Sequence, residues 1–299
     1  MAKEKSNIIN EYHLNRHKPE CPQFALYDLK AHLMENQCQV VRPHIHSFYQ
    51  VIWFKKGKGK HSVDFKTYDV FDNSIFFVGP KQVHHFDENY DYEGVLFHFN
   101  RLFLLQEQSP LDFFLHFNLF NNSLHQSSLN VSTGIVDTLD RYVSQIKDEL
   151  NNEETFGKEL ILGSYLKSFL IQVQRKKNIF EQGSEVWSPT FNDKRLVLMR
   201  FINLIDENYK KGYTIAEYAS SLHISSRSLS DLTHQQLHKT PSQMVQERII
   251  LEAQRLLLYS NSNVNQVAYR LGFEDASYFV KYFKKYTGVS PKDFRKSIS

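Results

Sequence analysis

The chain has 299 residues, enough for two domains with separate cores, and its formal net charge is only +3. Its first residues lack the apolar core of a signal peptide, and no apolar run approaches the length of a membrane-spanning helix, which argues against secretion and membrane insertion. The two cysteines, Cys21 and Cys38, have neither metal-binding nor redox spacing, so we expect free thiols in a cytoplasmic protein.

The charge is unevenly distributed along the chain. The segment from Lys194 to Ser299 carries a net charge of +7, whereas the preceding residues together carry −4. Basic residues attract phosphate, so affinity for nucleic acid is expected in the C-terminal third.

Residues 24–100 have the pattern of short β-strands. Alternating, aromatic-rich runs are separated by Gly, Asp, Asn and Lys, and this favours a small antiparallel barrel. The five predicted strands are Phe48–Phe54, His61–Phe65, Ser74–Val78, Val83–Phe86 and Gly94–Phe99.

Two histidine-containing segments stand out in this region. Pro43 to His46 reads PHIH, Gly57 and Gly59 follow, and the later segment from Gly79 to His84 reads GPKQVH. This combination resembles a cupin-type sensor domain, which implies a barrel around a ligand site.

Polar residues of these segments are candidates for the lining of a pocket. His44 and His46 alternate along one strand, so both point to the same face, and His84 on a neighbouring strand is available to complete a three-histidine metal site. Metal-binding cupins usually supply a carboxylate where this chain has Gln50. We therefore expect a pocket for a small organic ligand, without metal, cofactor or catalytic residue. The expected polar groups are His44, His46, Gln50 and His84, and the expected walls are Phe48, Trp53 and Phe77, although strand register is not fixed by sequence.

Helices are predicted after the barrel. Residues 101–124 are apolar and aromatic with Pro110 among them, and suggest a short helix or covering segment. Thr133–Leu150 and Phe156–Gln174 have apolar residues at helical spacing, with Asn151 and Asn152 between them, which predicts a helical hairpin. The apolar stripes of this hairpin are explained either by dimerisation or by packing within one chain.

A polar segment separates this part from the C-terminal third. Arg175–Asp193 combines a charge run with Gly, Ser and Pro and favours an extended linker, in which Trp187 is a large apolar exception. A helix over Asp193–Tyr209 is then predicted to begin the next domain.

The C-terminal third contains one helical pattern twice, over Thr214–Met244 and Val264–Phe294. Each copy has a short apolar-faced helix, a tight turn, a second helix and a proline at its end. Ser225 and Asp275 are predicted N-caps of the second helices, and Gly272 supplies backbone freedom in the later turn. The pattern predicts two helix-turn-helix units, and a plain helical bundle with a solvated lysine face is the alternative.

The second copy is the more specific of the two. Its residues A-L-GF-SYF-K-FKK-TG-SP-DFR, between Ala268 and Arg295, closely resemble the signature of AraC-type transcription regulators. The resemblance covers residues 193–296 and implies two helix-turn-helix units joined by a rigid helix, here Ser242–Tyr259. It also implies that the second helices enter successive major grooves about 34 Å apart. Helices such as the predicted hairpin pair two subunits in relatives.

The two predicted reading helices differ in charge. The family pattern places basic residues at the positions of Lys281, Lys284 and Lys285, whereas the first copy has Asp231, His234 and Gln235 there. The expected DNA-binding residues are Arg227, Ser230, Ser277, Lys281, Lys284 and Lys285. The first unit is thus expected to read sequence with little phosphate affinity, while the second carries the salt-dependent binding.

Together these patterns predict an α+β chain of two domains. The expected parts are a cupin-like antiparallel β-barrel over residues 1–125, a helical dimerisation segment over 126–178, a linker over 179–192 and an all-α double helix-turn-helix domain over 193–299. The predicted function is a sequence-specific transcription regulator, by family default an activator, that binds double-stranded DNA as a homodimer, responds to a small-molecule effector and is able to contact RNA polymerase. The alternatives are a metal-dependent cupin enzyme fused to a DNA-binding domain and an effector-free architectural DNA binder.

Overall fold

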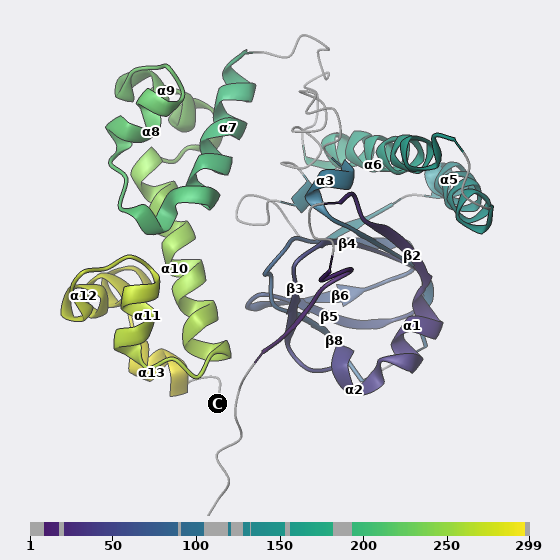
Figure 1. Cartoon of the computed structure of the whole chain (residues 1–299), viewed down its shortest axis with the longest axis horizontal. Coiled ribbons are helices and arrows are strands. Elements are labelled where there is room, and N and C mark those ends of the chain that lie inside the picture. Colours follow the sequence, from purple (N-terminus) through teal and green to yellow (C-terminus); the bar gives the residue numbers. More distant parts are fainter. Residues whose placement is uncertain are drawn as a thin grey trace, which may run out of the picture. The chain divides into compact units, whose positions relative to one another are not determined.

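The computed structural model describes residues 9–17, 21–88, 91–104, 119–120, 128–131, 133–152, 156–181 and 193–296 (Figure 1). The chain separates into an N-terminal unit, Asn10–Ser188, and a C-terminal unit that comprises Pro189–Ser299 together with Met1–Ile9. Residues 182–192, which include Trp187 and most of the predicted linker, lie outside the described residues, as does the greater part of 101–124. Among the helices of the described ranges, none has the length and apolar character that crossing a membrane requires.

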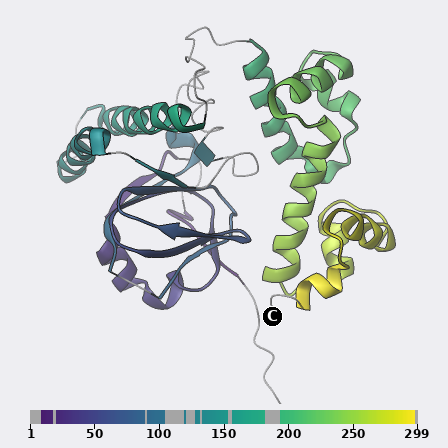
Figure 2. The ribbon, with the colours of Figure 1, turned by 180° about the vertical axis from the view of Figure 1, so that it is seen from behind.

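The N-terminal unit is built on two five-stranded sheets, as Figure 2 shows from behind. The pairings are antiparallel except that between β1 and β3, which is parallel. The first sheet has the order β1 (Asn10–Tyr12), β3 (His44–His46), β8 (His84–Phe86), β5 (Gly59–Val63) and β6 (Lys66–Val70). The second has the order β10 (Ser128–Asn130), β7 (Ser74–Val78), β4 (Tyr49–Lys56), β9 (Glu93–Phe99) and β2 (Phe24–Asp28).

The five predicted strands are confirmed, with Ser74–Val78 matching β7 at both ends. The sequence reading missed β2, β6 and two short helices, α1 (Leu29–Glu35) and α2 (Gln37–Val40). Helix α1 begins where the Asp28 carboxylate accepts a hydrogen bond from the amide of Ala31, and it buries Leu29 and Leu33.

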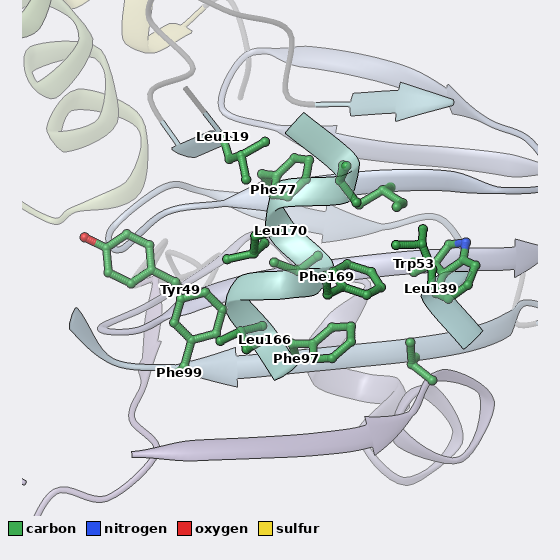
Figure 3. Close-up of a cluster of buried hydrophobic side chains, with 14 of the residues drawn as sticks. Tyr49, Trp53, Phe77, Phe97, Phe99, Leu119, Leu139, Leu166, Phe169 and Leu170 are labelled. Carbon is green, nitrogen blue, oxygen red and sulfur yellow. The ribbon is translucent and has the colours of Figure 1, made fainter. Parts of the chain in front are cut away.

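Strand β4 shows how one strand serves two cores. Its alternate residues Tyr49, Val51 and Trp53 pack in one cluster, whereas Ile52 and Phe54 pack in the interior between the sheets. The first cluster also includes buried residues of the helix Lys158–Glu181, which covers this face of the sheet. Figure 3 shows Phe169 beside Trp53 and Phe97, and the ring centres lie 5.8 and 4.9 Å from that of Phe169.

The predicted helical hairpin is present as α5 (Thr133–Asn151) and α6 (Lys158–Glu181), and a short helix α3 (Arg101–Leu104) precedes it. Residues Leu166, Phe169, Leu170 and Val173 of α6 recur at helical spacing and are buried. Helix α6 continues to Glu181, so the charge run that was expected to begin the linker is helical. This corrects the predicted start of the extended segment.

The C-terminal unit is entirely helical in its described part. It contains α7 (Asp193–Asn208), a 3-10 turn η1 (Tyr209–Lys211), α8 (Ile215–Ser221), α9 (Ser226–Leu237), α10 (Pro241–Tyr259), α11 (Val264–Arg270), α12 (Ala276–Thr287) and α13 (Pro291–Lys296). Capping boxes begin α8, α10 and α11, at Thr214, Thr240 and Asn263. The two predicted helix-turn-helix units are therefore α8–α9 and α11–α12.

The turns of the two units have the same backbone geometry. His223 and Gly272 occupy equivalent positions with positive φ, +58° and +85°. The amides of the residues that follow, Ile224 and Phe273, both donate to a helical carbonyl at 3.1 Å. A Cβ added at Gly272 would lie only 1.9 Å from the carbonyl oxygen of Lys210, so glycine is required there by contact as well as by φ.

We expect Gly272→Ala to lower the free energy of unfolding of the C-terminal unit by at least about 2 kcal/mol, because the backbone of Lys210 must move and a left-handed residue is strained. His223→Gly at the equivalent turn should change it by less than about 1 kcal/mol, since relief of strain offsets the added freedom of the unfolded chain. Urea titration followed by circular dichroism measures both, and equal effects at the two turns would contradict this account.

Candidate functional site

Helix α9 is the candidate reading helix of the first unit. The hydroxyl of Ser225 accepts a hydrogen bond from the amide of Ser228 and caps the helix, and Leu229 and Leu232 are buried. Arg227 is exposed and Ser230 is half-buried. Asp231, His234 and Gln235 are also exposed, so this surface carries few permanent positive charges.

Helix α12 has the same frame and a different surface. The Asp275 carboxylate accepts hydrogen bonds from the amides of Ser277 and Tyr278, and these bonds hold the pKa of Asp275 below its usual value. Phe279 and Phe283 are buried, which confirms the predicted inward face. Ser277, Lys281, Lys284 and Lys285 are exposed.

The intervening helix α10 fixes the separation of α9 and α12. Its 19 residues span about 28 Å at 1.5 Å per residue, which is close to one turn of DNA. Near its middle, Arg248 donates to Asp206 of α7 at 2.7 Å and to Glu252 at 3.0 Å. Near its end, Arg295 of α13 donates to the carbonyl oxygens of Leu257 and Ser262 at 2.7 and 2.6 Å.

The N-terminal unit contains a polar cavity of about 180 Å³. Strands β1, β2, β3, β4 and β9 and helices α1 and α2 contribute side chains to it. None of the residues that line it is Asp, Glu, Lys or Arg: they are Tyr12, His13, Leu14, Tyr27, His32, Asn36, Gln39, Val40, His44, His46, Phe48, Gln50 and His98.

Hydrogen bonds fix the histidines on one side of this cavity. His44 and His46 donate their Nδ1–H groups to the carbonyl oxygens of Arg42 and Phe48, at 2.9 and 3.0 Å. Burial lowers the pKa of His44 to about 4 and that of His46 to about 3, so both rings are neutral near pH 7. A neutral ring that donates from Nδ1 accepts at Nε2.

The Gln50 amide links two of these rings. Its Oε1 lies 3.1 Å from Nε2 of His46, and its Nε2 lies 2.8 Å from Nε2 of His98. Because Nε2 of His46 accepts, the amide nitrogen of Gln50 donates to it and the amide oxygen accepts from His98, an orientation obtained by rotating the amide by 180°. The chain His46–Gln50–His98 thus joins β3, β4 and β9.

Two further histidines lie deeper between the sheets. The ring of His84 is 4.2 Å from that of His44 and 4.6 Å from that of His46, and His61 lies 5.4 Å beyond it. Neither ring nitrogen of His61 or His84 has a hydrogen-bond partner among the described residues. Burial, followed by the nearby histidines, holds the pKa of both rings well below the usual value.

The structure brings together three of the five predicted pocket residues, His44, His46 and Gln50, at the cavity wall. His84 lies behind them and does not line the cavity. Trp53 was wrongly placed there: it follows Gln50 by three positions, an odd number, so it points to the opposite face of β4 and packs on α6. Phe77 is in the same cluster, whereas Phe48 does line the cavity.

The sequence reading missed His98. It follows Leu96 in the inward alternation of β9 and lies directly opposite Gln50. A polar residue in the otherwise apolar run GVLFHF was the available signal.

The three-histidine metal hypothesis can be tested on this geometry. Nε2 of His46, the nitrogen that would bind a metal, is already hydrogen-bonded to Gln50, which offers an amide instead of a carboxylate. Within the described ranges, no group of three or more His, Cys, Asp or Glu residues is arranged to hold a metal ion. The described residues at this site therefore do not fit a cupin metal centre.

Comparison with known proteins identifies both units. The AraC-like ligand binding domain family matches residues 31–158, and a helix-turn-helix domain family matches residues 218–297. The HTH-type transcriptional activator RhaS of Mannheimia succiniciproducens is 22% identical over 261 residues, which cover 86% of this chain and 90% of RhaS. The HTH-type transcriptional activator RhaR of Enterobacter is 20% identical over 258 residues, which cover 86% of this chain and 87% of RhaR. The chain belongs to the AraC family of transcription regulators.

Other relatives match a smaller part of this AraC-family regulator. An HTH-type transcriptional regulator of Bacillus subtilis is 34% identical over 106 residues, 36% of this chain and 37% of the relative. Among solved structures, ToxT of Vibrio cholerae is 15% identical with a TM-score of 0.41, covering 92% of this chain and 97% of ToxT. The C-terminal domain of the response regulator yesN of Fusobacterium nucleatum is 30% identical with a TM-score of 0.31, covering 35% of this chain and 98% of that domain.

The AraC-family assignment decides between the classes that the sequence left open. The chain has a ligand-binding domain and a DNA-binding helix-turn-helix domain, and the relatives are transcription regulators, not enzymes.

The buried histidines of this AraC-family regulator predict acid sensitivity. In the unfolded chain a histidine has a pKa near 6.5, whereas in the folded chain the pKa of His44, His46, His61, His84 and His98 is lower. The unfolded state therefore binds more protons below pH 6.5, and stability falls as the pH drops. The expected loss is roughly 1 kcal/mol for each histidine between pH 7.5 and 5.5.

His61→Phe isolates one of these contributions. The ring of His61 already packs against Phe54, Phe76 and Phe86, so phenylalanine fits its surroundings. We expect the variant to melt higher than the parent protein, by more at pH 5.5 than at pH 7.5, in differential scanning calorimetry. A pH dependence identical to that of the parent would show that His61 does not take up a proton on unfolding.

Proposed function

We propose that this AraC-family protein is a one-component transcription activator that works in the cytoplasm as a homodimer. A small molecule binds the cavity of the N-terminal unit, α9 and α12 read DNA, and the bound protein assists RNA polymerase. The relatives that cover most of the chain are named transcriptional activators, which supports activation over repression.

The effector is best matched by an uncharged polar molecule. The cavity has no charged side chain in its lining, so it offers no partner for a carboxylate, phosphate or ammonium group. It offers instead the acceptor Nε2 of His44, amide groups such as Gln39 and the aromatic rings of Tyr27 and Phe48. Its volume of about 180 Å³ suits a compact ligand with several hydroxyl groups.

The two helix-turn-helix units contribute differently to DNA binding. The exposed lysines of α12 supply phosphate affinity, since each cation that neutralises a phosphate releases a counterion. On α9, Arg227 is positioned to contact base edges near the helix N-terminus, with Ser230 beside it, while Asp231 disfavours close phosphates. This asymmetry is the observation on which the DNA-binding proposal rests.

Dimerisation is proposed to use the outer surface of α6. Leu160 and Ile161 lie near its start, and their side chains are 59% and 39% exposed. Adjacent apolar side chains in contact with water are favoured sites for a second subunit.

Binding isotherms at several salt concentrations test the reading helices. Lys284→Ala and Lys285→Ala should weaken binding to specific and scrambled duplexes about equally, and each should reduce the slope of log K against log salt by about 0.9. Lys281→Ala and Arg227→Ala should instead lose discrimination at one or two base pairs, by about 1–3 kcal/mol for a bidentate contact and less for lysine.

Gln235→Ala is the matched control, because Gln235 occupies on α9 the position of Lys285 on α12 and carries no charge. Its salt slope should equal that of the parent protein. If Gln235→Ala lowered the slope as much as Lys285→Ala, the two units would be electrostatically equivalent and the proposed division of labour would be wrong.

The dimer is tested with a charge on α6. Leu160→Glu in the full chain should convert dimers to monomers at micromolar protein in sedimentation equilibrium, since a buried unpaired carboxylate opposes association. Phe71→Glu is the control, because Phe71 is similarly exposed, at 54%, and lies after β6. A parent protein that is monomeric at every concentration would refute the proposed dimer.

A further inference from the structure

Helix α12 carries a row of tyrosines on one flank. Tyr278, Tyr282 and Tyr286 are four residues apart, with ring centres 6.3 and 4.8 Å from one another. Phe273, in the preceding turn, lies 6.0 Å from the ring of Tyr278 and 5.2 Å from that of Tyr282. The four rings form one continuous cluster, which we call the tyrosine row.

The tyrosine row is not required by the helix-turn-helix frame. At the repeat offset of 50 residues, Ser228, Leu232 and Gln236 occupy the corresponding positions of α9. Only Leu232 of these is buried, so the first unit builds the same frame without aromatic rings on this flank. The row is a property of the second unit.

The position of Tyr278 on α12 is close to the lysine face. At 100° per residue it lies about 60° from Lys281 around the helix axis, and Lys281 in turn lies opposite the buried Phe279 and Phe283. The side chain of Tyr278 is 60% exposed although two rings contact it. Its hydroxyl is therefore accessible while its ring is held.

The dimensions of a DNA groove determine what meets this flank. A helix with its side chains is about 10–12 Å wide, and the major groove is about 12 Å wide. If Lys281 faces the floor of the groove, both flanks of α12 meet its walls, which are the sugar–phosphate backbones. Ser277 and Lys284 lie on one flank, and the tyrosine row lies on the other.

We propose that Tyr278 is a neutral backbone contact of the second unit, with its hydroxyl donating to a phosphate oxygen of one DNA strand. Phe273 and Tyr282 are positioning residues that hold the ring of Tyr278. Tyr286, over which Nζ of Lys285 lies at 5.4 Å, extends the support toward the helix C-terminus. This inference rests on the proposed entry of α12 into the groove.

A neutral donor has a signature that a lysine lacks. It adds affinity for any sequence, but it neutralises no phosphate and releases no counterion. Tyr278→Phe in the full chain should therefore weaken binding to a 30-base-pair random-sequence duplex roughly threefold to tenfold at every salt concentration, with an unchanged salt slope. Lys285→Gln should weaken binding and also lower the slope by about 0.9.

The matched control is Tyr269→Phe. Tyr269 is also 60% exposed but lies on α11, outside the tyrosine row, so its loss should leave the affinity unchanged. For the positioning role, Tyr282→Ala should reproduce the effect of Tyr278→Phe. Tyr282→Phe, which keeps the ring, should restore at least half of the lost affinity. Thermal melts identical to that of the parent protein identify variants that fold normally.

The possible results separate this inference from the proposed function. If the lysine variants lower the slope while Tyr278→Phe binds within twofold of the parent protein, the tyrosine contact is wrong and α12 still reads DNA. If neither the lysine nor the tyrosine variants change binding, the proposed reading helix is wrong as well. Normal DNA binding by Tyr278→Phe with reduced transcription in vitro would overturn the backbone contact and assign the row to a protein partner.

Discussion

The ion-pair cluster around Arg248 joins the helices that support the two helix-turn-helix units. Its guanidinium bonds to Asp206 of α7 and Glu252 of α10 and lies 4.2 Å from the ring centre of Tyr209 in η1. One largely buried cation therefore joins α7, η1 and α10. Burial alone would lower the pKa of Arg248, but the neighbouring carboxylates raise it above its already high value. Without Arg248, Glu252 would be left in a largely buried site with the more distant Arg255, at 3.7 Å, as its ion-pair partner.

The consequence is a fixed distance between two DNA contacts. Helix α9 packs on α7 and α10, while α11, α12 and α13 pack on α10 farther along. Two units on a rigid helix bind DNA with little loss of internal freedom, because their separation is set before binding. In the proposed division of roles, this rigidity lets the lysines of α12 bring the weakly charged α9 to the DNA.

Much of this arrangement could be predicted from sequence because it repeats. The helix-turn-helix pattern, the caps at Ser225 and Asp275 and the buried Phe279 follow from local spacing alone. Helix α1 was missed because it has only seven residues, of which Leu29 and Leu33 are buried. Its N-cap, Asp28, is also the last residue of β2, so no loop separates the strand from the helix. The wall of the cavity was predicted in part: Gln50 lines it, whereas Trp53 lies on the opposite face of β4, because register depends on pairing with β7 and β9.

The position of the pocket suggests how a ligand affects the rest of the chain. An uncharged effector adds no charge, and fields are screened over about 8 Å at physiological ionic strength, so it cannot act on DNA through electrostatics. It acts by favouring one arrangement of the protein over another. Strands β4 and β9 carry Gln50 and His98 on the pocket side, and Trp53 and Phe97 against Phe169 of α6 on the other. The proposed effector site and the proposed dimer helix are thus separated by a single sheet. A shift of β4 and β9 that rearranges the His46–Gln50–His98 hydrogen bonds must also change the packing of Trp53 and Phe97 against α6.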